Sequence, residues 1–279
     1  MRRKIFAAII AFAVVVISIT ARTREPRPAL PTHRPNLNPM LCAHRGVKMM
    51  APENTLPAIA KAIEMGYNYA EIDVRYTRDG VPVLMHDDWI TRMTLMPGPP
   101  RAYSLATLKK FRAGFWRGPE FADTRIPTME EVLKLMQGRI KLYLDQKEMP
   151  RPQELKLLKD YGFFPDNMVI VGGGPQQKKF VEWDPAAPVM PGVSRVEDLS
   201  ARLKEFPDMV AIDAPCETLS AELIDAAHAA GLMVFTDVVN QLPFREEACM
   251  RRPIELGSDV IQIDNPALFQ KLIEEYRKR

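Results

Sequence analysis

The sequence predicts an α/β fold, a (β/α)8 TIM barrel with a β-hairpin extension after the second strand. A chain of 279 residues with 47% hydrophobic content suits one large domain, and barrels of this class take about 250 residues. Short apolar stretches alternate with helical patterns, which is typical of βα units and parallel strands. The tight-turn signal Asp79-Gly80 after the second stretch predicts the hairpin.

Eight apolar stretches are the predicted barrel strands. They are residues 41–44, 69–76, 140–145, 168–171, 188–193, 209–213, 232–236 and 260–264. A ninth stretch, residues 81–86, is expected to double back from the turn and to return His86 toward the second strand. Helices are expected at 55–65, 129–136, 220–230 and 266–278, with Asn54 and Thr128 as N-cap residues of the first two.

The N-terminus has the pattern of an export signal. Arg2, Arg3 and Lys4 precede an apolar run over residues 5–21, which predicts a signal peptide. The region before Ala21 is a poor cleavage site, so a retained membrane anchor stays open. Residues 22–38 are rich in proline and are expected to form a linker, with the barrel domain at 39–279. The domain is therefore expected outside the cytoplasm, periplasmic or extracellular, or tethered to a membrane.

Composition excludes several classes of function. The net charge of +3 is too small to indicate a nucleic-acid partner. The cysteines Cys42, Cys216 and Cys249 lack metal-type spacing and form no evident disulfide framework. Cys42 lies on a probable strand and is interpreted as a small buried hydrophobic residue.

Two histidines stand at strand ends beside polar partners. His44 is followed by Arg45 and Gly46, and His86 is followed by Asp87. Hydrolysis of a phosphodiester needs a base for the nucleophile and an acid for the leaving alkoxide, and two histidines can divide these tasks. The guanidinium of Arg45 matches phosphate oxygens and stays charged. A lone histidine at a strand end is more often structural, but two beside a carboxylate pair indicate catalysis.

Carboxylates are also placed for metal binding. Glu71 and Asp73 lie on alternate positions of one strand, so their side chains point to the same side. Hard oxygen ligands favour one divalent cation, Mg²⁺ or Ca²⁺. Taken alone, the pair would be interpreted as two solvated carboxylates. Asp145 and Lys147 likewise share a strand face; Asp145 could complete the metal shell and Lys147 could approach a phosphate, or the two form an ordinary ion pair.

The order and spacing of these residues resemble the glycerophosphodiester phosphodiesterase family over residues 41–266. The motifs that carry the resemblance are His44-Arg45-Gly46, Pro52-Glu53-Asn54-Thr55, Glu71-x-Asp73, Thr77-x-Asp79-Gly80, His86-Asp87 and the closing residues 257–266. The resemblance implies a metal-dependent TIM barrel that releases glycerol 3-phosphate and an alcohol. It also implies that His44 and His86 are the acid/base pair, that Arg45 grips the phosphate, and that Glu71 and Asp73 hold the metal.

Departures from the family pattern fall around the substrate pocket. The chain has Asp145-Gln146-Lys147 where the family usually has Glu-x-Lys, and Phe235-Thr236 where it has Trp-Thr. The predicted function is hydrolysis of glycerophosphodiesters. One alternative is a lysophospholipase D-type activity on a lysophospholipid. The stretch Leu95, Met96, Pro97 and Pro99 would suit a lipid-facing lip, but it equally suits a packed loop. A non-catalytic binding barrel would be expected to lose a histidine or a metal carboxylate, and none is lost.

Overall fold

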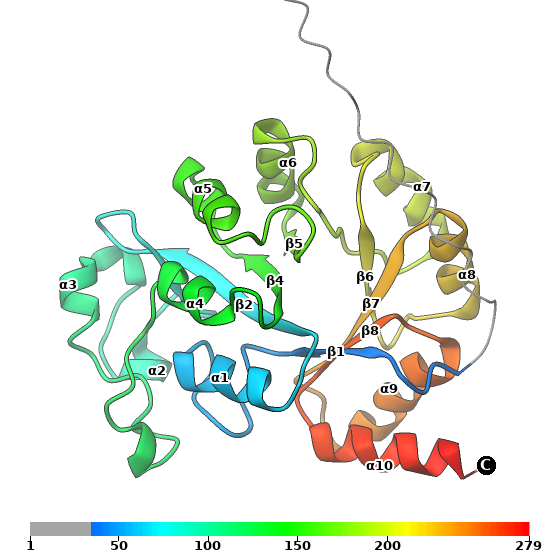
Figure 1. Ribbon diagram of the computed structural model, residues 1–279, viewed down its shortest axis with the longest axis horizontal. Helices are drawn as coiled ribbons and strands as arrows, with labels where there is room; N and C mark the ends of the chain where they lie inside the picture. Colours follow the sequence, from blue (N-terminus) through cyan, green and yellow to red (C-terminus); the bar gives the residue numbers. More distant parts are fainter. Residues whose placement is uncertain (1–34, 279) are drawn as a thin grey trace, which may run out of the picture.

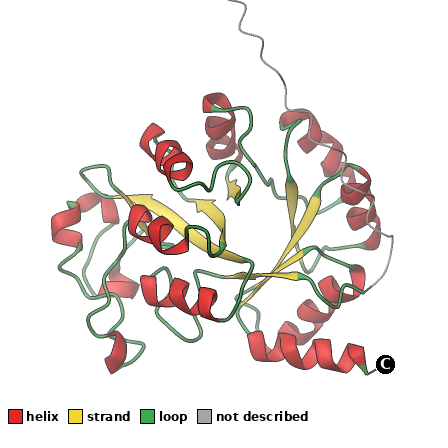
Figure 2. Ribbon diagram, in the orientation of Figure 1, coloured by secondary structure: helices red, strands yellow, loops and turns green. Residues whose placement is uncertain are grey.

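The computed structural model describes residues 35–278. Strands form an inner ring and helices surround it (Figures 1 and 2). The strands are β1 Met40–Ala43, β2 Tyr69–Tyr76, β3 Pro82–Leu84, β4 Lys141–Gln146, β5 Met168–Gly172, β6 Ala211–Pro215, β7 Met233–Val238 and β8 Val260–Ile263. The sheet order is β5-β4-β2-β1-β8-β7-β6, with every pair on this path parallel. The predicted TIM barrel is confirmed.

The helices that cover the strands follow them in alternation. They are α1 Leu56–Glu64, α4 Met129–Met136, α5 Pro152–Asp160, α6 Gly174–Trp183, α7 Val196–Glu205, α8 Ala221–Ala229, α9 Pro243–Leu256 and α10 Pro266–Arg277. Thr128 forms the capping box expected at α4 with Glu131, and Ser220 caps α8 by accepting a hydrogen bond from the Leu223 N–H. In the described part of the chain no helix is long and apolar enough to span a bilayer; the apolar run at 5–21 lies outside the described residues.

The predicted strand at 188–193 forms isolated bridges in place of a regular ladder. Val189 bridges to Ile170 of β5, and Gly192 bridges to Asp213 of β6, so the segment joins the two edges of the sheet. Pro188 and Pro191 lack an N–H and contribute only carbonyls, which accept hydrogen bonds from the N–H groups of Ile170 and Asp213. The segment therefore takes the strand position between β5 and β6 and nearly closes the barrel.

The predicted hairpin after β2 is confirmed. Gly80 adopts a φ of +81° in the turn, and β3 pairs antiparallel with β2, Leu84 opposite Val74. Beyond it, residues 88–126 form a segment that we call the insertion. It holds α2 Thr91–Thr94, α3 Leu105–Leu108 and two short 3₁₀ turns, Pro100–Ala102 and Pro119–Phe121. The sequence did not predict this substructure, whose helices have only a few residues each and project to one side of the barrel (Figure 1).

The assignment of Asn54 as the N-cap of α1 is wrong. Asn54 adopts a left-handed backbone with φ +53°, and Thr55 precedes the helix. Asparagine tolerates this conformation better than most residues. Its side chain binds Asp73 instead: the amide donates to Asp73 Oδ2 at 2.6 Å and the amide oxygen accepts from Asp73 N at 3.1 Å. A residue expected to start a helix thus fixes a carboxylate of the site.

A plug of buried side chains fills the barrel beneath the strand ends. Tyr69 and Tyr143 each pack edge-to-face against Phe235, and Cys42 is buried in the same cluster without a disulfide partner. The interpretation of Cys42 as a buried hydrophobic residue is confirmed.

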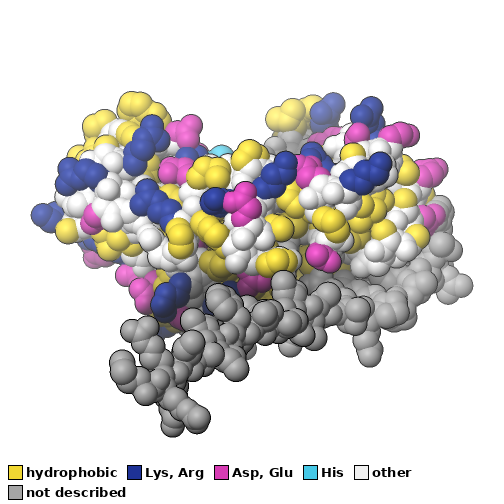
Figure 3. All heavy atoms as spheres, turned by 90° about the horizontal axis from the view of Figure 1, so that it is seen from above, with side chains coloured by type: hydrophobic (Ala, Val, Ile, Leu, Met, Phe, Trp, Pro, Cys, Tyr) yellow, Lys and Arg dark blue, Asp and Glu magenta, His cyan; other side chains and the backbone are white. Residues whose placement is uncertain are grey.

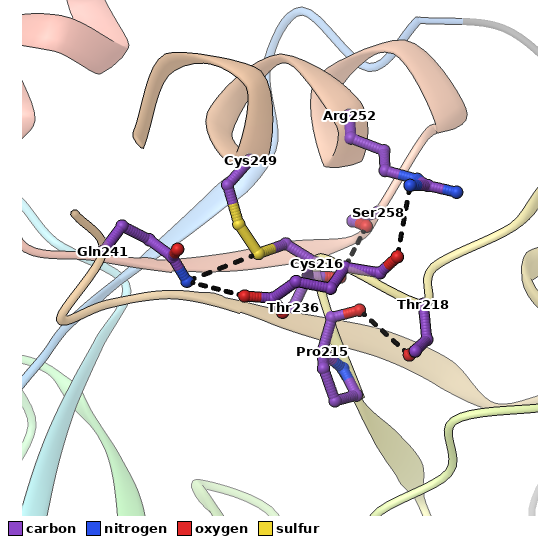
Figure 4. Close-up of a disulfide and its surroundings, with 9 residues drawn as sticks. Pro215, Cys216, Thr218, Thr236, Gln241, Cys249, Arg252 and Ser258 are labelled. Atoms are coloured by element: carbon purple, nitrogen blue, oxygen red, sulfur yellow. Dashed lines mark hydrogen bonds between the residues drawn. A yellow bond between two sulfur atoms is a disulfide. The ribbon is translucent and has the colours of Figure 1, made fainter. Parts of the chain in front are cut away.

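A disulfide joins Cys216, directly after β6, to Cys249 in α9 (Figure 4). The two Cα atoms are 5.4 Å apart, although 33 positions separate the residues in sequence. The spacing of the cysteines in the sequence did not indicate this disulfide, because a disulfide depends on distance in the fold. Gln241, just before α9, contacts Cys216 Sγ and donates a hydrogen bond to Glu217 (Figure 4).

Replacing both Cys216 and Cys249 by serine should lower the free energy of unfolding by about 2–4 kcal/mol, because the crosslink restricts the unfolded chain. Urea denaturation with and without dithiothreitol measures this. The reductant should destabilise the wild type and leave the double variant unchanged. Equal midpoints for all samples would show that the crosslink contributes nothing.

Candidate active site

His44 follows the last residue of β1 and is held by a carboxylate from the neighbouring strand end. Its Nδ1 lies 2.8 Å from Oδ1 of Asp264, the residue after β8. Burial lowers the pKa of His44 below its ordinary value, and the contact with Asp264 opposes this. Burial acts to raise the pKa of Asp264, but the contacts with His44, Lys48 and the backbone N–H of Asn240 together outweigh it and bring the value to about 2. With Nδ1 engaged, Nε2 remains for proton transfer.

His86 has the same arrangement on the returning arm of the hairpin. Its Nδ1 lies 2.8 Å from Oδ1 of Asp87. Arg92 of the insertion forks onto Asp87 at 2.6 and 3.1 Å. These partners outweigh burial and lower the pKa of Asp87 to about 2. The carbonyl of His86 accepts hydrogen bonds from Arg75 at 3.1 and 2.8 Å, so the backbone and the ring are both held.

The three predicted metal carboxylates come together. Glu71, Asp73 and Asp145 each place an oxygen within 4.8 Å of the others, which makes them a candidate cation site. The register sets Asp73 of β2 opposite Asp145 of β4. Burial and the charges of Asp73 and Asp145 raise the pKa of Glu71 well above its ordinary value. A divalent cation bound here would offset the repulsion between these buried carboxylates. Carboxylate oxygens are the ligands that a hard cation prefers.

Two cations lie against these carboxylates. Lys147 Nζ is 2.9 Å from Asp73 Oδ1 and 2.5 Å from Asp145 Oδ2, and Arg45 Nε is 3.3 Å from Asp73 Oδ2. Burial acts to raise the pKa of Asp73, but Lys147 and Arg45 outweigh it and lower the value. The ion pair between Asp145 and Lys147 that the sequence left open is present. The phosphate-binding roles of Arg45 and Lys147 stay predictions.

The turn after His44 depends on a glycine. Arg45 has a φ of +54° and donates its N–H to Glu71 Oε2 at 2.6 Å. Gly46 follows with φ +71°, and a Cβ there would lie 2.6 Å from the carbonyl carbon of Ala58 in α1. The turn thus directs a backbone N–H at the carboxylate of Glu71, and it brings the chain close to α1 at Gly46.

The sequence did not assign a role to several residues that hold the site in place. Asp264 and Asp87 orient the histidines, and Glu53 accepts hydrogen bonds from Arg45 at 2.9 Å and from Arg92 at 2.8 and 2.7 Å. Asp237 of β7 faces the same space, and burial raises its pKa well above the ordinary value. Its position at a strand end was the available signal, but single acidic residues at strand ends are common.

All seven predicted site residues line one cavity of about 100 Å³. They are His44, Arg45, Glu71, Asp73, His86, Asp145 and Lys147, joined by Tyr143, Asp237, Val239 and Gln262. The cavity lies at the carboxyl ends of the strands, where barrels of this class carry their active sites. It brings two oriented imidazoles, four carboxyl groups and two cations together, a set suited to acid/base chemistry on an anionic ester.

Known proteins share this sequence pattern and fold. The Glycerophosphoryl diester phosphodiesterase family matches residues 44–162, which include every residue of the predicted site. Over these residues the chain is similar to this family.

Over nearly the whole chain, the sequence identity to members of the family is lower. A glycerophosphodiester phosphodiesterase of Bacillus subtilis is 26% identical over 260 residues, covering 84% of this chain and 86% of the relative. Higher identities of 35% and 40% occur over shorter segments that span 63% and 40% of the relatives' length. Members of the family generally use a divalent metal, and the cluster of Glu71, Asp73 and Asp145 is the candidate site.

Solved structures of the family share the barrel. The glycerophosphodiester phosphodiesterase from Agrobacterium tumefaciens superposes with a TM-score of 0.75 at 23% identity, covering 84% of this chain and 99% of that chain. An Oleispira antarctica phosphodiesterase, solved with the product sn-glycerol-3-phosphate, gives a TM-score of 0.72 at 26% identity, covering 85% and 97%.

Proposed function

We propose that the protein hydrolyses glycerophosphodiesters to glycerol 3-phosphate and an alcohol. The observation that carries this is the pair His44 and His86, each oriented through Nδ1 by a carboxylate and both lining the cavity that holds the acidic cluster. The Oleispira antarctica relative with its glycerol 3-phosphate product supports the same substrate class.

Each residue of the site has a task in this proposal. Glu71, Asp73 and Asp145 would hold one divalent cation, Mg²⁺ or Ca²⁺, which would stabilise charge on the phosphoryl oxygens. Arg45 and Lys147 would bind the phosphate. His44, whose lowered pKa keeps it neutral, suits the role of base, and His86 suits the role of acid.

We propose that the reaction proceeds through a cyclic phosphate. One histidine takes the proton of the glycerol 2-hydroxyl, whose oxygen attacks phosphorus. The bond from phosphorus to the alcohol oxygen breaks, and the other histidine gives that oxygen its proton. Water then opens the ring with the two histidines in exchanged roles, so that one proton returns to the glycerol oxygen.

A substrate analogue that lacks the 2-hydroxyl should therefore turn over at least roughly 10²-fold more slowly than its parent, since no neighbouring nucleophile remains. Initial rates of alcohol release from the two compounds measure this. Equal rates would show that water attacks phosphorus directly.

The reaction class is tested by release of glycerol 3-phosphate from a panel of glycerophosphodiesters that differ in the alcohol, with and without a chelator. A lysophospholipid in the same panel tests the lysophospholipase D-type alternative. Release of glycerol 3-phosphate in the absence of chelator supports the proposal, whereas release of a lysophosphatidic acid alone supports the alternative. No phosphodiester cleavage at all would contradict both.

We further propose that the domain works outside the cytoplasm, delivered or tethered by residues 1–21. The disulfide between Cys216 and Cys249 supports this, because structural disulfides persist in oxidising compartments. Mass spectrometry of the native N-terminus should find either a chain that begins near residue 22 or an intact N-terminus in the membrane fraction. An intact chain in the cytoplasmic fraction would contradict both forms.

A further inference from the structure

Large hydrophobic side chains are exposed in the insertion. They are Trp89, Leu95, Met96, Phe115 and Trp116, with exposed fractions between 37% and 69%. The insertion still has a small core of its own, which includes Ile90, Met93 and Leu108. The insertion therefore exposes these side chains although it has a core in which others are buried. A group of exposed apolar side chains of this kind marks an interaction site.

A second group of exposed hydrophobic side chains lies across the mouth of the barrel, and we call it the rim. The rim consists of Met49 and Met50 after β1, Met149 after β4, and Leu242 and Phe244 at the start of α9. Loops that follow parallel strands meet at one end of a barrel, which is the end that carries the cavity. Figure 3 shows hydrophobic side chains on two crests along one edge of the molecule, with a histidine in the dip between them.

Contacts hold these loops in place. Lys48, next to Met49, bonds to Asn240 at 2.7 Å and so joins the loop after β1 to the loop before α9. Arg75 pairs with Asp88 at 2.8 Å and with Glu148 at 3.5 Å, which joins the insertion to the loop after β4. The apolar side chains are thus presented on loops tied to one another.

The insertion is also basic. It contains seven Lys and Arg residues against three Asp and Glu residues. Arg101 and Lys110 are exposed, and within the described chain neither they nor Arg117 forms an ion pair. Arg112 has only a 3.7 Å contact with Asp123. Phe115 and Trp116 lie between Arg112 and Arg117 in the sequence, so cationic residues flank these two aromatic residues.

We propose that the insertion and the rim dock on the surface of an anionic phospholipid bilayer, with the cavity opening toward the lipid. Aromatic side chains favour the bilayer interface, and each cation near an anionic surface strengthens binding about fivefold. The exposed apolar side chains match the acyl region of such a bilayer, and the positive charges match its anionic headgroups. The proposal concerns where the domain sits and does not depend on the reaction.

Tryptophan fluorescence tests the proposal in the full chain. The three tryptophans are Trp89 and Trp116 in the insertion and Trp183 at the far end of α6, and residues 1–34 contain none. Vesicles carry brominated acyl chains, which quench only inserted tryptophans. They are made of phosphatidylcholine alone or mixed with phosphatidylglycerol. Strong quenching is expected with the anionic vesicles and several-fold weaker quenching with the neutral ones.

Variants separate the surface from the apolar N-terminal run. Trp183→Phe should keep the quenching, whereas Trp89→Phe with Trp116→Phe should remove it. Arg112→Glu with Arg117→Glu should reduce it to the level of neutral vesicles. Equal quenching in both lipids, no quenching when the chain is bound to vesicles, or quenching that survives removal of Trp89 and Trp116 would each overturn the proposal.

A different observation concerns Arg92, which bridges the two halves of the site. One side of its guanidinium binds Asp87, the partner of His86, and the other binds Glu53, the partner of Arg45. The two carboxylates lie on different loops, and the guanidinium of Arg92 joins these loops by bonding to both. We infer that Arg92 is a positioning residue that fixes His86 relative to Arg45; this rests on the proposed reaction.

Double-variant kinetics test this role once wild-type turnover is established. Arg92→Lys should lower kcat roughly tenfold, because an ammonium cannot fork onto two carboxylates. Arg139→Lys, at an exposed arginine outside the insertion and the rim, is the matched control and should have the kcat of the wild type. Arg92→Lys combined with Asp87→Asn should be no slower than the slower single variant, since both act through one network.

A merely structural role would give a different pattern. It would lower the unfolding midpoint without altering the dependence of kcat on pH, whereas misplacing His86 should alter that dependence. Wild-type kcat in Arg92→Lys, or fully multiplicative losses in the double variant, would overturn the inference. An inactive wild type would instead contradict the proposed function and is recognised before any variant is compared.

Discussion

Replacing His44 or His86 by alanine is expected to lower kcat by about 10²–10⁴-fold in each case, the usual contribution of a general acid or base. The structure supports the expectation because each ring has Nδ1 fixed by a carboxylate at 2.8 Å and lines the cavity. Removing both should cost much less than the product of the single losses, because the two rings act in the same proton transfers.

The matched control for these variants is His228. It also bonds to an aspartate, with Nε2 3.0 Å from Asp259 Oδ2, but it lies on α8 away from the cavity. His228→Ala should keep wild-type kcat. Turnover within a few-fold of wild type in His44→Ala or His86→Ala would remove that histidine from the mechanism.

The pH dependence follows from the environment of His44. Burial lowers its pKa, so the neutral form that accepts a proton persists to lower pH than for a free imidazole. If His44 is the base, the acidic limb of the kcat/KM profile should therefore lie below the ordinary imidazole value. An acidic limb above that value would assign the base to another group.

The second large effect is expected from removing the divalent cation. Exhaustive chelation should reduce turnover by roughly 10²-fold or more, because a bound cation contributes several kcal/mol of charge stabilisation. Mg²⁺ or Ca²⁺ should restore it, and the better of the two identifies the preferred ion. Activity that survives chelation in protein shown by elemental analysis to be free of metal would contradict this.

Substitutions at the acidic cluster should act through metal affinity. Asp73→Asn should weaken binding of the cation in calorimetric titration, whereas Glu64→Gln, an exposed carboxylate on α1, should bind as the wild type does. Asp145→Glu restores the residue that the family usually has and should retain binding. Unchanged affinity in Asp73→Asn would exclude this cluster as the metal site.

The sequence determined most of the strands, the hairpin and the predicted site residues that line the cavity. The strands can be recognised in the sequence because a buried parallel strand must be apolar along its length. The alternation of side chains placed Glu71 and Asp73 on one face, and the Asp79-Gly80 turn placed His86 beside them. These features depend on neighbours within a few residues, which a pattern can show.

Only the tertiary structure decided which groups orient the site. Asp264 is 220 positions from His44, and nothing local indicates that β8 closes against β1 to bring them together. The same holds for the disulfide between Cys216 and Cys249, and for Asn54, which leaves its expected helix cap to bind Asp73. Such partners are fixed by packing between distant segments, so the sequence supplied the candidate groups and the nearly closed barrel supplied their geometry.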